Sequence, residues 1–173
     1  MKKNQLTVTE ALKFARHDIL NELQLVLIHI DLGDTAKARS AILHATDKMK
    51  QVSSLSLLGL PETEEWITTF DWVYSAFHKT LKTTIEPGNR KVNDSDIVSY
   101  LTYVFENIAK VLDPIIEYEV LLDVRATSLD WSICITVNNA LQGKMSMPKA
   151  DIDYLVVEEK TEDNLWMFTL SGQ

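Results

Sequence analysis

Apolar residues recur every three or four positions in two runs, and this spacing constrains the fold more than any other feature. The first run is Val8, Leu12, Ala15, Ile19, Leu23, Val26 and Ile30, and the second is Ala38, Ile42, Ala45, Met49, Val52 and Leu55. Such steps line one face of a helix that packs against another helix. Between the runs, Gly33 can end one helix and Asp34 can cap the next. The first third is therefore predicted to form an antiparallel helical hairpin.

Two helices alone would leave much of this apolar surface in water. Each arm is about 35 Å long at roughly 1.5 Å per residue. Two hairpins paired around a twofold axis would bury the surface in a four-helix bundle. The sequence therefore predicts a homodimer.

The stretch "LLGLPE", which includes Gly59 and Pro61, marks the end of the hairpin. We therefore expect two domains, a helical hairpin at 1–58 and a C-terminal domain at 59–173. Residues 62–77 are compatible with a helix or a strand, and we favour a helix. A well-marked helix follows Asp94 or Ser95, either of which can cap it, and Pro114 closes it. Its expected buried stripe is Ile97, Leu101, Val104, Ile108 and Val111.

Alternating patterns predict the strands of the C-terminal domain. They cover residues 78–86, 115–126, 130–139, 153–160 and 164–172, and residues 161–164 can form a hairpin turn. We expect an α/β sandwich, with one mostly antiparallel sheet covered on one side by one or two helices. The predicted fold class of the whole chain is α+β.

Charge and composition exclude several classes of function. The 17 Lys and Arg residues against 25 Asp and Glu residues give a net charge of -8, which argues against nucleic-acid binding. No apolar stretch approaches the length of a membrane span, and the N-terminus lacks a signal-peptide core. The single cysteine, Cys134, sits in a strand pattern and is expected to be a small buried residue. These features predict a cytoplasmic protein without membrane contact.

His17 stands on the first predicted helix, roughly 150° from the centre of the apolar stripe. Its face mixes Phe14, Leu25 and Ile28 with Asn21, and apolar residues on a solvent face often indicate a partner surface. Two plainer interpretations stay open. An isolated exposed histidine is usually inert, and the apolar residues could belong to the core of the dimer.

Metal binding and hydrolytic triads lack support. The four histidines include no pair at helical ligand spacing and no cysteine partner, so no metal site is expected. No G-x-S-x-G motif is present. A nucleophilic role suits His17 better, because a neutral imidazole nitrogen is a good nucleophile near neutral pH. Asp18 can orient the ring, Arg16 can bind phosphate oxygens, and Asn21 can support the ring or the donor.

The segment "RHDILNELQLV" resembles the sporulation initiation phosphotransferase B family. It is also similar to the dimerising domains of histidine kinases, in which an acidic residue follows the histidine and Asn or Thr stands four positions after it. His17, Asp18 and Asn21 fill those places. The resemblance implies that His17 carries a phosphoryl group, and that the C-terminal domain has the fold of a histidine-kinase ATPase domain. On the face of His17 we expect a partner surface made by Phe14, Leu20, Gln24 and Ile28.

A kinase of this type needs glycine-rich segments around ATP. After Pro61 the chain has only Gly88, Gly143 and Gly172, each isolated. Asn107 occupies the place of a metal-binding asparagine, but its neighbours depart from the kinase pattern, and a helix-surface role is the better interpretation. We expect no ATP site and no kinase activity.

The resemblance then implies a relay. The phosphoryl group would pass from the phospho-aspartate of one response regulator to His17, and from there to the aspartate of a second response regulator. The chain would bind no cofactor, and the receiver domain would supply Mg²⁺. Two alternatives stay open, a fragment of a sensor-type histidine kinase and a dimeric adaptor without enzymatic activity.

Overall fold

The computed structural model describes residues 6–110, 112–113, 116–138, 156–162 and 165–173. The chain divides into two compact units, Met1–Gln51 and Val52–Gln173. The division falls inside the second of the two long helices, α1 (Val8–Asp31) and α2 (Thr35–Ser54). The domain boundary predicted after residue 58 stays a prediction.

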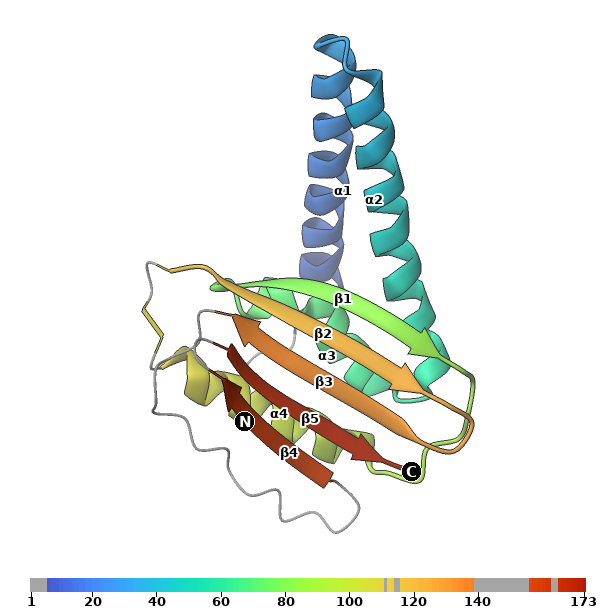
Figure 1. Ribbon diagram of the computed structural model, residues 1–173, viewed down its shortest axis with the longest axis vertical. Helices are drawn as coiled ribbons and strands as arrows, with labels where there is room; N and C mark the ends of the chain where they lie inside the picture. Colours follow the sequence, from blue (N-terminus) through green and yellow to red (C-terminus); the bar gives the residue numbers. More distant parts are fainter. Residues whose placement is uncertain (1–5, 111, 114–115, 139–155, 163–164) are drawn as a thin grey trace. The chain divides into compact units, whose positions relative to one another are not determined.

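The helical hairpin has the ends that its sequence predicts (Figure 1). Gly33 has a φ of 72°, in the left-handed region that glycine tolerates. The Asp34 carboxylate accepts a hydrogen bond of 2.9 Å from the Lys37 amide, and this bond lowers the pKa of Asp34. At the start of α1, the hydroxyl of Thr7 and the carboxylate of Glu10 form a capping box. Both predicted turn residues are therefore confirmed.

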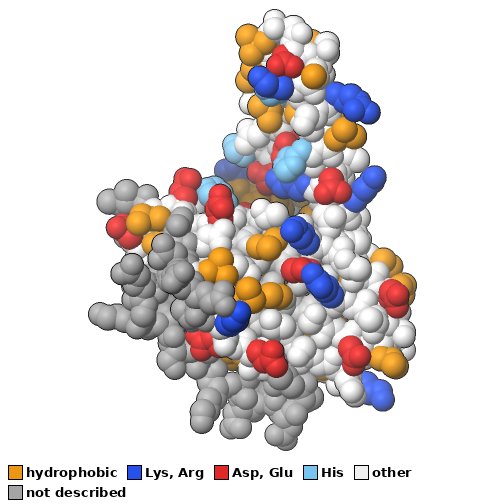
Figure 2. All heavy atoms as spheres, in the orientation of Figure 1, with side chains coloured by type: hydrophobic (Ala, Val, Ile, Leu, Met, Phe, Trp, Pro, Cys, Tyr) orange, Lys and Arg blue, Asp and Glu red, His pale blue; other side chains and the backbone are white. Residues whose placement is uncertain are grey.

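The helix face that is covered within the hairpin takes in only the smaller members of the predicted apolar stripe, among them Ala15, Val26, Ala38 and Ala45. No residue of α1 is buried, and Leu12 and Leu23 are 55% and 60% exposed. The partly buried side chains of α1 are Ala11, Phe14, Ala15, Asp18, Glu22, Val26 and His29. On α2 the covered side chains include Ala38, Ala41 and Ala45. Small side chains let the two helices approach closely, so the bulky members of the stripe lie outside their contact. Figure 2 shows hydrophobic side chains among charged ones on the surface of the hairpin.

The second unit is a five-stranded sheet covered on one face by two helices (Figure 1). The helices are α3 (Pro61–Val73) and α4 (Asp94–Ala109), and the strands are β1 (Phe77–Ile85), β2 (Tyr118–Ala126), β3 (Trp131–Asn138), β4 (Val156–Glu162) and β5 (Leu165–Gly172). The strand order is β1-β2-β3-β5-β4, with β1 and β2 parallel and the other pairs antiparallel. The predicted α+β fold class is confirmed, as is the helix favoured for residues 62–77, which ends at Val73. Residues 111, 114–115, 139, 153–155 and 163–164 of the predicted elements lie outside the described residues.

The core lies between the sheet and its two helices. Four predicted stripe residues of α4, Ile97, Leu101, Val104 and Ile108, are buried, and Phe105 meets Phe70 of α3 edge to face at 4.8 Å. Leu55, predicted on the stripe of the hairpin, instead lies in the short helix η1 (Leu55–Leu58) and is fully buried in this core. Cys134 is only partly buried, because alternation along β3 places it on the face of the sheet opposite the helices.

Asp94 caps a helix, but this helix is α3 and not α4 as predicted. Asn93 is the residue that precedes the helix, and Asp94 does not cap α4. The Asp94 carboxylate instead accepts hydrogen bonds from the amides of Glu62 and Thr63 at 2.6 and 3.0 Å, and from the Thr63 hydroxyl. Asp94 therefore caps the first turn of α3, whose amide groups lack partners within their own helix.

Alkali is expected to destabilise the second unit through Tyr100. Burial raises the pKa of this phenol to about 12, from the ordinary value of 10.0, and Glu159 contributes to the rise. Between these values the unfolded chain loses a proton that the folded chain keeps, so the free energy of unfolding falls as pH rises from about 10 toward 12. Urea unfolding at several pH values should show this decline, and a Tyr100→Phe variant should show less of it. Equal declines would contradict the assignment to Tyr100.

Candidate functional site

His17 lies in the third turn of α1, with 71% of its side chain exposed. The partly buried face of α1 includes Asp18 and Glu22 but not His17. The imidazole therefore projects from the hairpin into solvent, on a rigid helix. The hairpin by itself leaves the ring open to an incoming molecule.

One nitrogen of the His17 ring is held by two side chains of α1. The Asn21 side-chain nitrogen lies 3.2 Å from Nδ1, as expected for residues four positions apart on a helix. An oxygen of the Asp18 carboxylate lies 3.6 Å from the same Nδ1, an electrostatic contact longer than a hydrogen bond. Among the described residues, no hydrogen bond or ion pair involves Nε2. The ring is oriented through Nδ1, and Nε2 is the nitrogen left for chemistry.

The other predicted site residues lie on the same side of α1 as His17 or next to it in the chain. Leu20 and Ile28 are 57% and 53% exposed, Gln24 is exposed, and Phe14 is half-buried. Helical rotation places these four within about 60° of the direction of His17, so they share its face. Arg16 is exposed but points about 100° away, and it makes no hydrogen bond or ion pair with His17. Two of the three predicted supporting residues, Asp18 and Asn21, are thus brought together with the imidazole.

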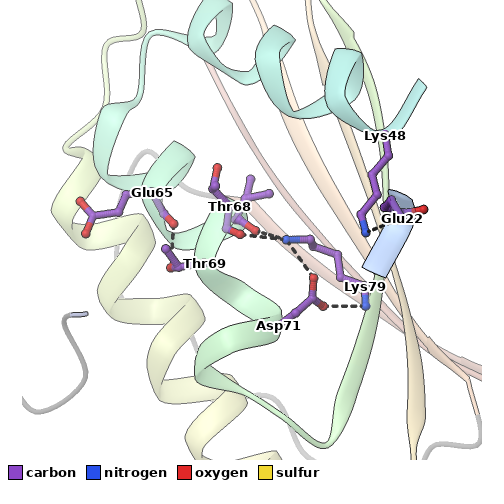
Figure 3. A network of polar contacts seen from close by, with 8 residues as sticks. Glu22, Lys48, Glu65, Thr68, Thr69, Asp71 and Lys79 are labelled. Atoms are coloured by element: carbon purple, nitrogen blue, oxygen red, sulfur yellow. Dashed lines mark hydrogen bonds and ion pairs between the residues drawn. The ribbon is translucent and has the colours of Figure 1, made fainter. Parts of the chain in front are cut away.

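A cross-helix ion pair beside the site was not predicted. Lys48 of α2 lies 3.3 Å from the carboxylate of Glu22, which stands one turn after Asp18 (Figure 3). Two carboxylates one helical turn apart repel each other, and the ammonium group of Lys48 compensates for that repulsion. Periodicity describes one helix at a time, so it does not show which residue of the other helix lies opposite.

Asn107, the candidate for a metal-binding asparagine, is engaged within its own helix. Its amide nitrogen donates to the carbonyl of Tyr103 at 2.8 Å, and its side-chain oxygen accepts from Lys110 at 3.1 Å. In the part of the chain that the structure describes, no three His, Cys, Asp or Glu residues are grouped to hold a metal ion. None of the described helices is both long and apolar enough to cross a membrane.

A model of a known family matches the part of the chain that contains the hairpin. Residues 1–58 match the family model for the alpha-helical domain of SpoOB-type sensor kinases. This segment contains His17, Asp18 and Asn21 together with the four residues of the expected partner surface. No curated protein sequence matches the chain at a significant level.

Several solved structures are similar to this chain at low sequence identity. The histidine kinase AdeS from Acinetobacter baumannii is 10% identical, with a TM-score of 0.45, over 91% of this chain and 97% of that chain. A histidine kinase from Burkholderia phymatum is 11% identical, with a TM-score of 0.46, over 96% and 98%. The histidine kinase ThkA in complex with the response regulator protein TrrA is 8% identical, with a TM-score of 0.48, over 94% of this chain and 60% of that chain.

Proposed function

We propose that this chain is a histidine phosphotransferase of a two-component phosphorelay, similar to the sporulation initiation phosphotransferase B family. It accepts a phosphoryl group from the phospho-aspartate of one response regulator and passes it to the aspartate of a second one. One observation carries the proposal. The imidazole of His17 is exposed on a long helix, and its Nδ1 is held while no hydrogen bond or ion pair among the described residues involves its Nε2.

The transfer proceeds by displacement at phosphorus. The lone pair of Nε2 attacks the phosphorus atom, the bond between phosphorus and the aspartyl oxygen breaks, and the carboxylate leaves as an anion. The nearby carboxylate of Asp18 stabilises the positive charge that develops on the ring. Phosphoryl transfer depends mainly on in-line positioning and charge neutralisation, which a receiver-bound Mg²⁺ provides in this proposal.

The distribution of charge supports docking on the hairpin. Residues 1–51 carry eight basic and six acidic side chains, whereas residues 52–173 carry nine basic and nineteen acidic ones. A receiver presents the acidic pocket that holds its Mg²⁺. The acidic C-terminal unit repels such a pocket, and the slightly basic hairpin does not. The match of residues 1–58 to the SpoOB-type helical domain supports the same assignment.

ATP-dependent kinase activity is the second candidate, because the matching family is a sensor-kinase family. The side chain of Asn107 is hydrogen-bonded within its own helix, which argues against a metal-binding role and hence against kinase activity. Incubating the chain with labelled ATP alone, and separately with a labelled phospho-receiver, distinguishes the candidates. A relay protein gains acid-labile label only from the receiver, a kinase gains it from ATP, and an adaptor stays unlabelled in both.

A cytoplasmic location, where response regulators act, is part of the proposal.

We further propose that two copies form a four-helix bundle through the exposed stripe of the hairpin. A Leu23→Glu variant should weaken the dimer at least about a hundredfold, because the bundle would bury an unpaired carboxylate. Sedimentation equilibrium measures the change. A wild-type chain that is monomeric at micromolar concentration would contradict the bundle.

Receiver docking should depend on the opposite face. An Ile28→Glu variant should bind a receiver at least about tenfold more weakly, since a charge replaces an apolar contact, while its dimer stays intact. Leu20→Glu and Gln24→Glu should act in the same direction. The Leu23→Glu variant is the matched comparison. If Ile28→Glu dissociates the dimer and leaves receiver affinity unchanged, these side chains belong to the bundle core.

A further inference from the structure

Arg90 joins three separate segments of the second unit. Its side chain is partly buried, and each of its three side-chain nitrogens donates to a backbone carbonyl. The acceptors lie at the end of η1, in the turn between β2 and β3, and directly after β1, namely Leu58 at 3.1 Å, Thr127 at 2.6 Å and Glu86 at 3.0 Å. A planar guanidinium group holds its donors in a fixed fork, which the ammonium group of a lysine does not. Arg90 therefore fixes the three segments to one another.

Two glycines from different segments make room for this group. Gly59 follows η1 with a φ of 76°, and a Cβ atom placed on it would lie 2.9 Å from the carbonyl oxygen of Gly88. A Cβ atom placed on Gly88 would in turn lie 2.9 Å from Nη1 of Arg90. Both distances are shorter than real Cβ contacts. A side chain at either position would therefore push the loop that carries Arg90 away from η1.

The segment that Arg90 holds continues α2. This helix runs unbroken to Ser54, and the chain then enters η1, whose Leu55 and Leu58 are fully buried in the core of the second unit. The hydroxyl groups of Ser54 and Thr83 lie 2.5 Å apart, so β1 also holds the end of α2. The last carbonyls of a helix lack partners within it, and Arg90 supplies one to Leu58.

The end of α2 that is held in this way is level with His17. The short turn at Gly33 makes α1 and α2 antiparallel, and Glu22 of α1 pairs with Lys48 of α2. His17 stands five residues before Glu22. At the same rise per residue, it is level with the position five residues after Lys48, which belongs to the last turn of α2.

We propose that Arg90 is a positioning residue for the His17 site, and that the second unit serves the hairpin by keeping the last turn of α2 helical. A helix end without such an anchor frays, because its final carbonyls have no partners. Fraying of α2 removes the surface against which α1 packs at the level of His17. The imidazole then loses its fixed direction, on which in-line phosphoryl transfer depends. This consequence for phosphoryl transfer rests on the proposed function.

Hydrogen exchange of the full-length chain measures the anchor and needs no receiver. In Arg90→Met the backbone amides of residues 49–58 are expected to exchange about tenfold to a hundredfold faster than in the wild type, because three carbonyls lose their donor. Gly88→Ala should act in the same direction, since its methyl group displaces the guanidinium group. The matched control is Arg125→Met, which removes an exposed arginine paired with Asp123 in the same unit and should leave the exchange of residues 49–58 unchanged.

The exchange of α4 distinguishes a local anchor from a general loss of stability. Its amides should keep the wild-type rates in Arg90→Met and Gly88→Ala. Ser54→Ala removes only one hydroxyl group from the same anchor, and it should speed exchange in residues 49–58 by about threefold even if Arg90→Met fails to fold. Wild-type exchange of residues 49–58 in these variants, or equal acceleration in α4, would overturn the anchor.

Phosphoryl transfer between receivers then tests the positioning role. The rate of transfer from a bound receiver should fall about threefold to tenfold in Arg90→Met, whereas receiver affinity should stay within about twofold. The affinity is kept because Gln24 and Ile28 of the expected docking surface lie nearer to the turn of the hairpin than His17 does. Faster exchange in residues 49–58 with a wild-type transfer rate would overturn the positioning role. If the wild type transfers no phosphoryl group at all, the proposed function fails, and the exchange result still decides the anchor.

Discussion

Replacing His17 with glutamine is expected to abolish transfer between receivers, by about three orders of magnitude or more. Glutamine retains polarity and similar length but offers no nucleophilic ring nitrogen. The measurement is the appearance of label on the second receiver after mixing with a phosphorylated first receiver and catalytic amounts of the chain.

The His17→Gln variant should remain folded, because the side chain is 71% exposed and packs against nothing in the core. The matched control is His44→Gln, which changes an exposed histidine on α2 of the same hairpin. Transfer at the wild-type rate by His17→Gln, or equal loss in both variants, would contradict a role for His17 as the phosphoryl carrier.

Replacing Lys79 with methionine is expected to lower the free energy of unfolding of the second unit by about 3 kcal/mol. The side chain of Lys79 is only 7% exposed, and its ammonium group donates to the carbonyls of Ile67 and Thr68 at 2.5 and 3.3 Å (Figure 3). It also lies 3.4 Å from the Asp71 carboxylate. Methionine keeps the apolar stem but leaves one carboxylate and two carbonyls near the end of α3 without this donor.

Denaturant unfolding followed by tryptophan fluorescence measures the loss, because all four tryptophans belong to the second unit. Lys82→Met is the control. Lys82 is exposed to solvent three residues after Lys79 in β1, so its replacement should change stability by less than about 0.5 kcal/mol. If both variants unfold with the same midpoint as the wild type, Lys79 does not stabilise the end of α3.

Local patterns predict most of the elements. The spacing of apolar residues predicts both hairpin helices, and alternation predicts the strands, because each pattern reflects the rotation per residue of its own element. The turn at Gly33 and Asp34 is local as well, since a left-handed residue and an N-cap depend on neighbouring positions in the chain.

Contacts between residues that lie far apart in the chain cannot be predicted from these local patterns. The carboxylate of Asp94 is a plausible cap for its own helix, yet it binds the amides of a helix that begins 33 positions earlier. Lys79 belongs to an alternating strand pattern, and only the packing of α3 beside β1 explains its burial. The parallel pairing of β1 and β2 depends on the path of the intervening helix, which no local pattern encodes.

In the candidate site, too, the local relations could be predicted and the contacts between elements could not. The motif around His17 predicts that Asn21 lies one turn away on the same face, and the structure places the two side chains 3.2 Å apart. Which nitrogen of the His17 ring faces Asn21 and Asp18 follows only from the coordinates of individual atoms. The Glu22–Lys48 pair joins two helices, so neither helical pattern alone could predict it.

The most direct measurement of the central claim is the position of the phosphate on a chain quenched midway through transfer between two receivers. We predict an acid-labile, alkali-stable phosphate on residue 17, attached to Nε2, whose decay matches the gain of label on the second receiver. A phosphate found on another residue, or an unmodified chain while the label moves directly between the receivers, would contradict the account.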